Sequence, residues 1–365
     1  MTENTEQIAR LRERIDAVDD RLIALLVERA SLAHAVGVAK GTAAVYRPER
    51  ERAIIERVIE KSRLLGARLD GASLARIYRE IMSACRSLEK PMRVAYLGPQ
   101  GTFCEMAAIG AFGHGVQMQP GPNIDEVFRA AETGQVDYAV VPIENSAQGT
   151  VTRTLDLLIR TSLCIVGEVN VPVVHNLMSR ASSLSDIKRV SAHPQALAQC
   201  YNWLTAHLPG IELVPEASNA KAAQAAQTDE SMAAIAAARA AELYDLRILA
   251  SAIQDDARNR TRFFVLGKTP VQDVPTHLAK TSVWFVCANV SGGLCQVLEP
   301  FKEHGVSMVK LESRPARTGG WEYTFYVDIE GFEKDANVRE ALDQMKQCTS
   351  VLKVLGSYPK AVDVV

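Results

Sequence analysis

Two basic side chains near the amino terminus share one face of a predicted long helix. Apolar residues recur every three or four positions from Ile8 to Val36, which predicts a helix running to about Lys40. At about 100° per residue, Arg29 and Lys40 lie only about 20° off a common line, whereas Arg12 lies roughly 100° away. If two such helices pair antiparallel, Arg12 of one chain reaches the other chain's site. The spacing fits a shared anion pocket, and it fits solvated surface cations as well.

Polar residues also follow a predicted buried strand, Asp137 to Val141. The strand runs into Pro142-Ile-Glu-Asn-Ser146, so Glu144, Asn145 and Ser146 stand at its carboxyl end, where open sheets bind ligands. Three clustered polar groups are compatible with a binding site and with an ordinary surface loop.

A threonine and an arginine enter a later strand, within Asn259-Arg-Thr-Arg-Phe263. Thr261 can donate its hydroxyl proton and Arg262 can pair with a carboxylate, although threonine in a strand is often only a strand former. Upstream, Thr102-x-x-Glu105 can form a helix capping box after a glycine-containing turn. Neither G-x-G-x-x-G nor G-K-[ST] occurs there, so the turn lacks a nucleotide-binding fingerprint.

The candidate residues above belong to a chain whose pattern changes twice, which predicts three successive domains. Residues 1–90 read as three amphipathic helices, the second from about Glu49 to Leu65 and the third from Ala72 to about Glu89. Strands and helices alternate over 91–270, with an alanine-rich segment, 218–243, expected to be helical. Residues 280–365 follow a proline-containing linker and show the order βαββαβ, the ferredoxin-like plan.

Composition sets the wider limits. A chain of 365 residues should form two or three domains, and a net charge of -2 gives no field that would gather nucleic acid or an anionic membrane. Seven scattered cysteines with no C-x-x-C pair indicate reduced thiols and no metal site. The amino terminus lacks signal-peptide features, and no uninterrupted apolar run approaches about 18 residues, so we expect a cytoplasmic protein.

The helical segment resembles the all-helical chorismate mutase domain, an intertwined dimer. The resemblance rests on Leu11-Arg-Glu-Arg-Ile15, Leu25-Leu-Val-Glu-Arg29, Val36-Gly-Val-Ala-Lys40 and Arg50-Glu51. It implies that Arg29 and Lys40 hold a carboxylate and the ether oxygen of chorismate, that Arg12 comes from the partner subunit, and that Glu51 binds the substrate hydroxyl. Arg50 is a further anion contact in this reading.

Two positions depart from the usual bacterial mutase pattern. Cys85 stands where serine is common, and Glu89 where glutamine is common. A carboxylate cannot donate to an ether oxygen, so Glu89 can assist only in its protonated form. A solvated glutamate at a helix end is the alternative.

The middle segment resembles prephenate dehydratase over nearly its whole length. The matching motifs are Leu97-Gly-Pro-Gln-Gly-Thr-Phe103, Pro142-Ile-Glu-Asn-Ser146, His175-Asn-Leu177, His193-Pro-Gln195, Ser218-Asn219 and Thr261-Arg-Phe263. The resemblance implies a two-lobed α/β domain like that of periplasmic binding proteins. Thr261 would donate to the leaving hydroxyl, while Arg262, Thr102 and the Asn145-Ser146 loop would bind carboxylates. Glu144 and His193 would order the cleft, and Ala192 replaces a usual hydroxyl residue.

The last segment resembles the ACT regulatory module, which binds phenylalanine between subunits in this family. Gly292-Gly-Leu294 and Glu312-Ser-Arg-Pro315 carry the resemblance, so Gly292, Gly293, Leu294, Glu312, Ser313 and Arg314 are the expected effector contacts. Glu312 and Arg314 would set a loop opposite the glycines. Ser291 and Gly293 replace the usual proline and alanine.

Taken together, the chain resembles the bifunctional chorismate mutase/prephenate dehydratase family of phenylalanine synthesis. The implied enzyme is a homodimer or higher homo-oligomer that needs no cofactor or metal, does not bind nucleic acid or membrane, and is inhibited by phenylalanine. Two other hypotheses remain open at this stage. The mutase domain could be degenerate and serve only dimerisation, or the chain could be a non-catalytic amino-acid sensor.

Overall fold

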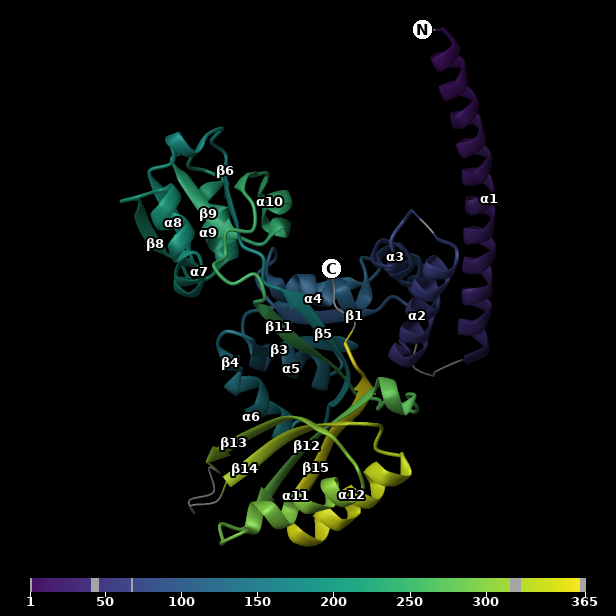
Figure 1. The fold of residues 1–365 in the computed structure, drawn as a ribbon, viewed down its shortest axis with the longest axis vertical. Coiled ribbons are helices and arrows are strands. Elements are labelled where there is room, and N and C mark those ends of the chain that lie inside the picture. The colour runs from purple at the N-terminus through teal and green to yellow at the C-terminus, as the bar shows by residue number, and fades with distance from the viewer. Residues whose placement is uncertain (1, 41–45, 67, 316–322, 362–365) are drawn as a thin grey trace. The chain divides into compact units, whose positions relative to one another are not determined.

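The computed structural model describes residues 2–40, 46–66, 68–315 and 323–361, except for the side chains of residues 2, 3 and 40. These residues form two compact units, which we describe one at a time. The first contains most of the amino-terminal helices, and the second contains two α/β lobes and the carboxyl-terminal sheet (Figure 1).

Helix α1 (Thr2–Lys40) is continuous and begins six residues before the apolar repeat. Its large apolar side chains are exposed, Leu25 and Leu32 each by more than half. By length and composition alone, the stretch Asn4–Ala39 could cross a membrane, since 18 consecutive residues within it have a mean hydropathy of 1.6. Glu28 and Arg29 interrupt its apolar residues, and charged side chains are costly inside a bilayer. An apolar stripe beside charged residues is typical of a helix that packs against protein.

Two shorter helices complete the first unit, α2 (Pro48–Leu64) and α3 (Gly71–Glu89). Asp70 caps α3 by accepting a hydrogen bond from the backbone N–H of Ser73 at 2.7 Å. A small core of Ile55, Ala75 and Met82 joins α2 to α3. All three predicted helices are confirmed; α1 begins six residues earlier than expected, and the ends of α2 and α3 lie within one residue of those expected.

The first α/β lobe is a mixed sheet in the order β2-β1-β3-β11-β5, with β4 paired to β3. Its elements are β1 (Arg93–Leu97), α4 (Phe103–Phe112), β2 (Gln117–Gly121), α5 (Ile124–Glu132), β3 (Tyr138–Asn145), β4 (Gly149–Thr150), α6 (Thr152–Arg160), β5 (Cys164–Pro172) and β11 (Arg260–Gly267). Strand β11 returns from the second lobe and lies antiparallel between β3 and β5.

The second lobe is a sheet in the order β10-β6-β9-β7-β8. Its elements are β6 (Asn176–Ser179), η1 (Leu184–Asp186), β7 (Arg189–Ala192), α7 (Pro194–Gln199), α8 (Tyr201–His207), β8 (Glu212–Pro215), α9 (Asn219–Ala226), β9 (Met232–Ala236), α10 (Ala238–Tyr244) and β10 (Arg247–Ala250). The expectation of an uninterrupted helical region over 218–243 is wrong. Every residue of β9 is buried, and tertiary burial at the centre of a sheet outweighs the helix propensity of alanine.

The carboxyl-terminal module has the predicted βαββαβ order, in a sheet arranged β13-β14-β12-β15. Its elements are η2 (Thr276–Leu278), β12 (Ala279–Cys287), α11 (Gly293–Glu303), β13 (Met308–Pro315), β14 (Tyr323–Glu330), α12 (Ala336–Cys348) and β15 (Val351–Pro359). Strand β13 runs on to Pro315, so Glu312 and Arg314 lie on a strand and not on the loop that we expected, because pairing with β14 continues to Tyr323.

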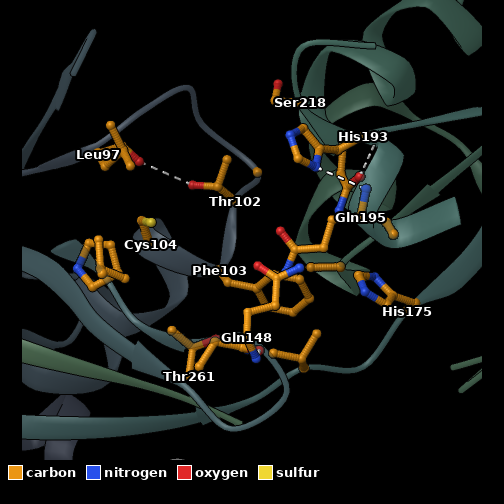
Figure 2. Close-up of a pocket in the computed structure, with 18 of the residues that line it drawn as sticks. Leu97, Thr102, Phe103, Cys104, Gln148, His175, His193, Gln195, Ser218 and Thr261 are labelled. Carbon is orange, nitrogen blue, oxygen red and sulfur yellow. Dashed lines mark hydrogen bonds between the residues drawn. The ribbon is translucent and has the colours of Figure 1, made fainter. Parts of the chain in front are cut away.

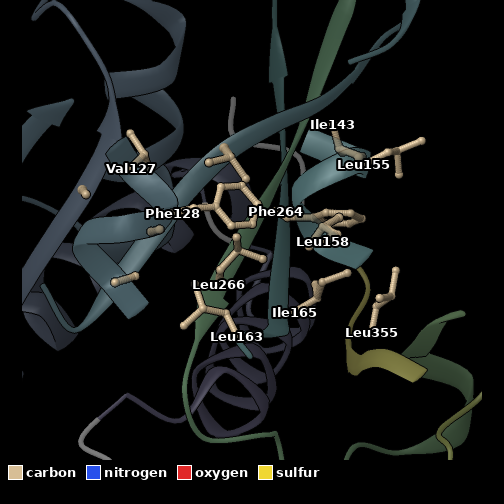
Figure 3. Packing of buried hydrophobic residues seen from close by; sticks show 14 of the residues in the cluster. Val127, Phe128, Ile143, Leu155, Leu158, Leu163, Ile165, Phe264, Leu266 and Leu355 are labelled. Carbon is tan, nitrogen blue, oxygen red and sulfur yellow. The ribbon is translucent and has the colours of Figure 1, made fainter. Parts of the chain in front are cut away.

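This module shares a hydrophobic core with the first lobe. Leu355 from β15 joins Leu158 and Ile165 in one buried cluster (Figure 3). Gly356 permits the close packing, since a Cβ there would lie 2.2 Å from the carbonyl oxygen of Ile165. The side of the ACT sheet that faces the first lobe is therefore part of that lobe's interior.

Candidate active sites

A cavity of about 480 Å³ lies between the two α/β lobes (Figure 2). Strand ends and helix starts from both lobes line it. The lining residues are Leu97, Gly98, Gly101, Thr102, Phe103, Cys104, Pro122, Pro142, Asn145, Gln148, Val151, Val173, His175, His193, Gln195, Ala196, Gln199, Ala217, Ser218, Asn219, Ala237, Thr261 and Phe263. Among the residues that the structure describes, no lysine, arginine, aspartate or glutamate belongs to this lining, so the described groups that could hold a charged ligand are neutral and polar.

Thr261 lies on β11 directly opposite Asn145 on β3. The Asn145 Nδ2 donates to Thr261 Oγ1 at 2.9 Å and to Asn259 Oδ1 at 2.9 Å. The Asn145 Oδ1 accepts from the backbone N–H groups of Ala147 and Gln148, which fixes the amide's orientation. Since Thr261 Oγ1 accepts from Asn145, its own proton remains available to donate toward the cavity.

Thr102 lines the cavity just before α4. Its hydroxyl donates to the carbonyl of Pro99 at 3.0 Å and accepts from the backbone N–H of Glu105. The buried Glu105 carboxylate accepts from the N–H of Gly101 at 2.7 Å. Half of the expected capping box is therefore formed, the bond from the Glu105 N–H to Thr102, whereas the Glu105 carboxylate bonds the N–H of Gly101 in place of that of Thr102. The result is a rigid turn beside the amino end of α4.

Cys104 also faces the cavity, but burial raises the pKa of its thiol to about 12. The thiol is protonated at neutral pH and is a poor nucleophile. All seven cysteines are free, as their spacing indicates.

His175 is a buried residue at the crossing between the lobes, with 2% of its surface exposed. Its Nε2 lies 2.9 Å from Gln199 Oε1, and burial lowers its pKa despite that hydrogen bond. An amide oxygen only accepts, so Nε2 carries the proton and Nδ1 is an acceptor. Nδ1 has no hydrogen-bond partner among the residues that the structure describes. His175 is thus a neutral imidazole beside the cavity, with its acceptor nitrogen buried.

The second lobe contributes the starts of α7 and α9. His193 Nδ1 accepts from the backbone N–H of Gln195, and the backbone N–H of His193 donates to Asn219 Oδ1 at 2.9 Å. Ser218 caps α9. Two further lining residues, Gln148 and Gln199, escaped the sequence analysis. Gln199 could have been predicted, because it lies four residues after Gln195 on α7 and therefore shares its helix face.

Arg262 does not line the cavity, contrary to its expected contact with a substrate carboxylate. Successive strand residues face opposite sides, so Thr261 faces the cleft while Arg262 faces the ACT sheet. There the guanidinium pairs with Glu168 of β5 and Asp328 of β14, each at 2.5 Å. Both carboxylates are almost fully buried.

Glu144 is likewise directed away from the cavity. Its carboxylate lies 2.8 Å from Lys310 Nζ on β13. Ser146, one residue beyond Asn145, bonds to Asn259 and to the backbone N–H of Arg260 and is not among the cavity-lining residues. Of the first lobe's candidates, the structure brings Thr102, Asn145 and Thr261 together at the cavity.

The expected effector residues of the ACT module lie in two places. Gly292 is the N-cap of α11 with φ +79°. A Cβ on Gly293 would lie 2.6 Å from the carbonyl oxygen of Ala288, so this turn requires the departure from alanine. Leu294 is half-buried against the ACT core. Glu312 accepts from Thr150, and Arg314 pairs with Asp156 at 2.7 Å. The side chain of Ser313 is exposed on the other side of β13.

The helical unit brings Glu89 against α1, because a Cβ on Gly37 would lie 2.8 Å from Glu89 Cγ. Cys85 is buried one turn earlier on α3. Arg29 is half-buried, and its Nη1 has no hydrogen-bond partner among the described residues. The Lys40 side chain lies outside the described part of the chain.

Three other mutase candidates are on helix surfaces. Arg12 is exposed on α1, and Arg50 and Glu51 lie in the first turn of α2, where Arg50 is exposed and Glu51 half-buried.

Comparisons with known proteins identify three domains in order. The family models for chorismate mutase type II, prephenate dehydratase and the ACT domain match residues 11–90, 94–271 and 281–347. A bifunctional chorismate mutase/prephenate dehydratase of Neisseria gonorrhoeae is 45% identical over 96% of both chains.

Two solved structures are similar over 73% of this chain, each with a TM-score of 0.68. One, with 34% identity over 90% of its length, is prephenate dehydratase from Arthrobacter aurescens in complex with L-Phe. The other, GqqA, described as a novel type of quorum-quenching acylase, is 30% identical over 98% of its length. The three family matches in order, and the full-length relative, show that this chain belongs to the bifunctional chorismate mutase/prephenate dehydratase family and carries an ACT domain.

Proposed function

We propose that the cavity between the lobes is where prephenate becomes phenylpyruvate, with Thr261 as the proton donor. One observation carries the assignment: Asn145 donates to Thr261 Oγ1, which leaves the threonine proton free for donation to a ligand in the cavity. General acid catalysis of this kind contributes about 10²- to 10⁴-fold to a rate.

In the proposed step, Thr261 gives its proton to the departing hydroxyl of prephenate, which leaves as water. The bond to the ring carboxylate breaks at the same time, carbon dioxide departs, and the bonding electrons complete the aromatic ring. The Asn145 amide stabilises the negative charge that develops on Thr261 Oγ1, which then regains a proton from solvent.

Backbone groups supply the electrostatics for the dianionic substrate. The first N–H groups of a helix lack partners within the helix, and their dipoles attract anions. Helices α4 and α9 both begin at the cavity wall, at Thr102 and Ser218. We assign the two substrate carboxylates to these helix starts, with Gln195 and the Thr102 hydroxyl as side-chain donors.

For the first reaction, the rearrangement of chorismate to prephenate, we propose a homodimer in which the exposed stripe of α1 is covered by a second copy. Arg29, Lys40, Glu51 and Glu89 would then meet Arg12 of the other chain. The chemistry would require positioning of a dianion and charge stabilisation at the breaking C–O bond, without a cofactor. Arg50 and Cys85 complete the proposed pocket.

The ACT module is proposed to bind phenylalanine and to inhibit the dehydratase. The relative from Arthrobacter aurescens was solved with L-Phe, which supports this effector for the present chain. Gly292, Gly293, Leu294, Glu312, Ser313 and Arg314 remain the candidate contacts. We also propose that the enzyme acts in the cytoplasm.

Separate assays of the two reactions test these assignments. The full chain should form phenylpyruvate from prephenate and should consume chorismate. Thr261→Ala should lower the first rate by about 10²-fold or more and leave the second near wild type, while Thr261→Ser should keep a donor and much of the activity. Dehydratase activity within about tenfold of wild type in Thr261→Ala would remove Thr261 as the donor.

A further inference from the structure

Two neighbouring residue pairs on β3 and β11 face opposite sides of the sheet. Thr261 is opposite Asn145, and Arg262 is opposite Glu144. The first pair lines the cavity, whereas the second pair faces the ACT module and bonds to it. Each cavity-facing residue is therefore covalently joined to a residue held by the ACT sheet.

Arg262 is fixed by charged groups from both modules. Its side chain is 12% exposed and pairs with Glu168 of the first lobe and Asp328 of the ACT strand β14, whose side chain is 0% exposed. Lys280 of β12 pairs with the same Glu168 at 2.8 Å. Two cations thus balance two carboxylates in a site with little water, where the interaction depends strongly on distance.

Tyrosine hydroxyls complete this ion cluster. Asp328 Oδ1 accepts from Ser282 and Tyr326, and the Arg262 Nη2 donates to Tyr358 at 3.1 Å. Because every charged group has partners in fixed directions, a displacement of β14 relative to β11 would break bonds at Arg262. The cluster therefore links the position of β14 to that of Thr261.

A second connection reaches Asn145 through Glu144. Lys310 of β13 pairs with Glu144 at 2.8 Å and donates to Thr150 Oγ1 at 3.1 Å. The same Thr150 hydroxyl donates to Glu312 at 2.9 Å. Glu312 belongs to the motif assigned to phenylalanine, two residues from Lys310 on the same side of the strand. A change at Glu312 thus acts on the hydroxyl that Lys310 also uses.

From these contacts we propose that Glu144 and Arg262 are positioning residues, through which the ACT sheet sets the geometry of Asn145 and Thr261. The effector signal would pass along Glu312, Thr150, Lys310 and Glu144 into the catalytic strand pair, with the Arg262–Asp328 pair as the second anchor. This inference rests on the proposed dehydratase site and on its inhibition by phenylalanine, and it adds the route between them.

The test uses the full chain and two lysine-to-methionine variants. Lys310→Met removes the bond to Glu144. Lys353→Met is the matched control, because Lys353 also joins the ACT module to the first lobe, but it donates to the carbonyls of Leu158, Ile159 and Thr161 at the end of α6 and not to Glu144. For each protein, kcat and KM for prephenate, inhibition by L-phenylalanine, binding of L-phenylalanine by equilibrium dialysis, and the chorismate rate are measured.

We expect Lys310→Met to bind phenylalanine as wild type does, yet to be inhibited much less at saturating phenylalanine, because the coupling between the sites, usually about 5- to 150-fold, is lost. The kcat of Lys310→Met should fall while its KM stays near wild type. Lys310→Arg should restore both the wild-type kcat and the inhibition by phenylalanine. Asp328→Asn should also lower kcat with little change in KM. Lys353→Met should match wild type in kcat and inhibition. If Lys310→Met does not fold, Thr150→Val carries the same expectation.

Several results would overturn the route. These are unchanged inhibition in Lys310→Met, an equal loss of inhibition in Lys353→Met, or loss of phenylalanine binding itself in Lys310→Met. A wild-type protein that does not convert prephenate, or that phenylalanine does not inhibit, marks a failure of the proposed function and is visible before any variant is compared.

Discussion

The Nδ2 of Asn145 donates to Oγ1 of Thr261 at 2.9 Å, across two antiparallel strands that end at the cavity between the lobes. The Asn145 amide is oriented by two backbone N–H groups that bond its oxygen. The direction of this hydrogen bond decides where the threonine proton can go, so the chemistry of the site depends on an amide that need not touch the substrate's reacting atoms.

Asn145→Asp should therefore inactivate the dehydratase even though it preserves shape. The new carboxylate oxygen would accept the Thr261 proton instead of donating, and would face Asn259 Oδ1 and the carbonyl of Arg260, which are both acceptors. We expect kcat for phenylpyruvate formation to fall by about 10²-fold or more, with the chorismate rate unchanged. Steady-state assays of both reactions check this. A variant with wild-type kcat would show that the hydrogen-bond direction is unimportant.

Much of the architecture follows from local patterns. The long apolar repeat of α1 and the order of the ACT elements were predictable because each element keeps its own periodicity. Strand β9 was not, since Met232-Ala-Ala-Ile-Ala236 has no alternation and its alanines favour a helix in isolation. Only burial on both faces of a sheet makes that segment a strand.

The site was partly predictable for a related reason. The period of a strand places Thr261 and Arg262 on opposite sides, but it does not reveal that the ACT sheet covers the Arg262 side. Glu168 and Asp328, its partners, come from strands far away in the sequence. Ion pairs between such distant residues depend on how the modules pack, which the sequence does not reveal. Without these partners, Arg262 was predicted to bind a substrate carboxylate.

His175 should make the protein less stable in acid. Burial lowers its pKa below the ordinary value of 6.5, so the unfolded chain binds this proton more readily than the folded one. The stability from a neutral His175 is present above about pH 6.5 and is lost as pH falls through the folded pKa, at up to about 1.4 kcal/mol per pH unit. His175→Gln should reduce the decline in unfolding free energy between pH 7 and 5, compared with wild type, by denaturant titration at each pH. Parallel declines in both proteins would contradict the assignment.

Gly356→Ala should disturb the packing of the ACT module on the first lobe. The added Cβ would lie 2.2 Å from the carbonyl oxygen and 2.9 Å from the nitrogen of Ile165, and backbone atoms cannot rotate away as a side chain would. Overpacking of this kind costs typically about 1–3 kcal/mol. We expect a lower unfolding free energy and weaker inhibition by phenylalanine, with the chorismate rate unaffected. Wild-type stability would show that β15 and β5 can separate without cost.

The remaining prediction concerns Glu89, which contacts Gly37 of α1 in the helical unit. A carboxyl group donates to the ether oxygen of chorismate only while it holds its proton, so the mutase kcat/KM should decline as pH rises. Glu89→Gln supplies an amide donor at every pH and should flatten that profile while keeping activity. The dehydratase should not share the decline, because a threonine donor does not titrate in this range.

Gly37→Ala provides a second, steric test of the same donor. Its Cβ would lie 2.8 Å from Glu89 Cγ and would push the carboxyl away, so the mutase rate should fall while the dehydratase rate stays constant. Measurement of kcat/KM for chorismate from about pH 5 to 9 checks both expectations. A level wild-type profile over that range, together with an active Gly37→Ala protein, would show that Glu89 is not the donor and that the dianion is held by cations alone.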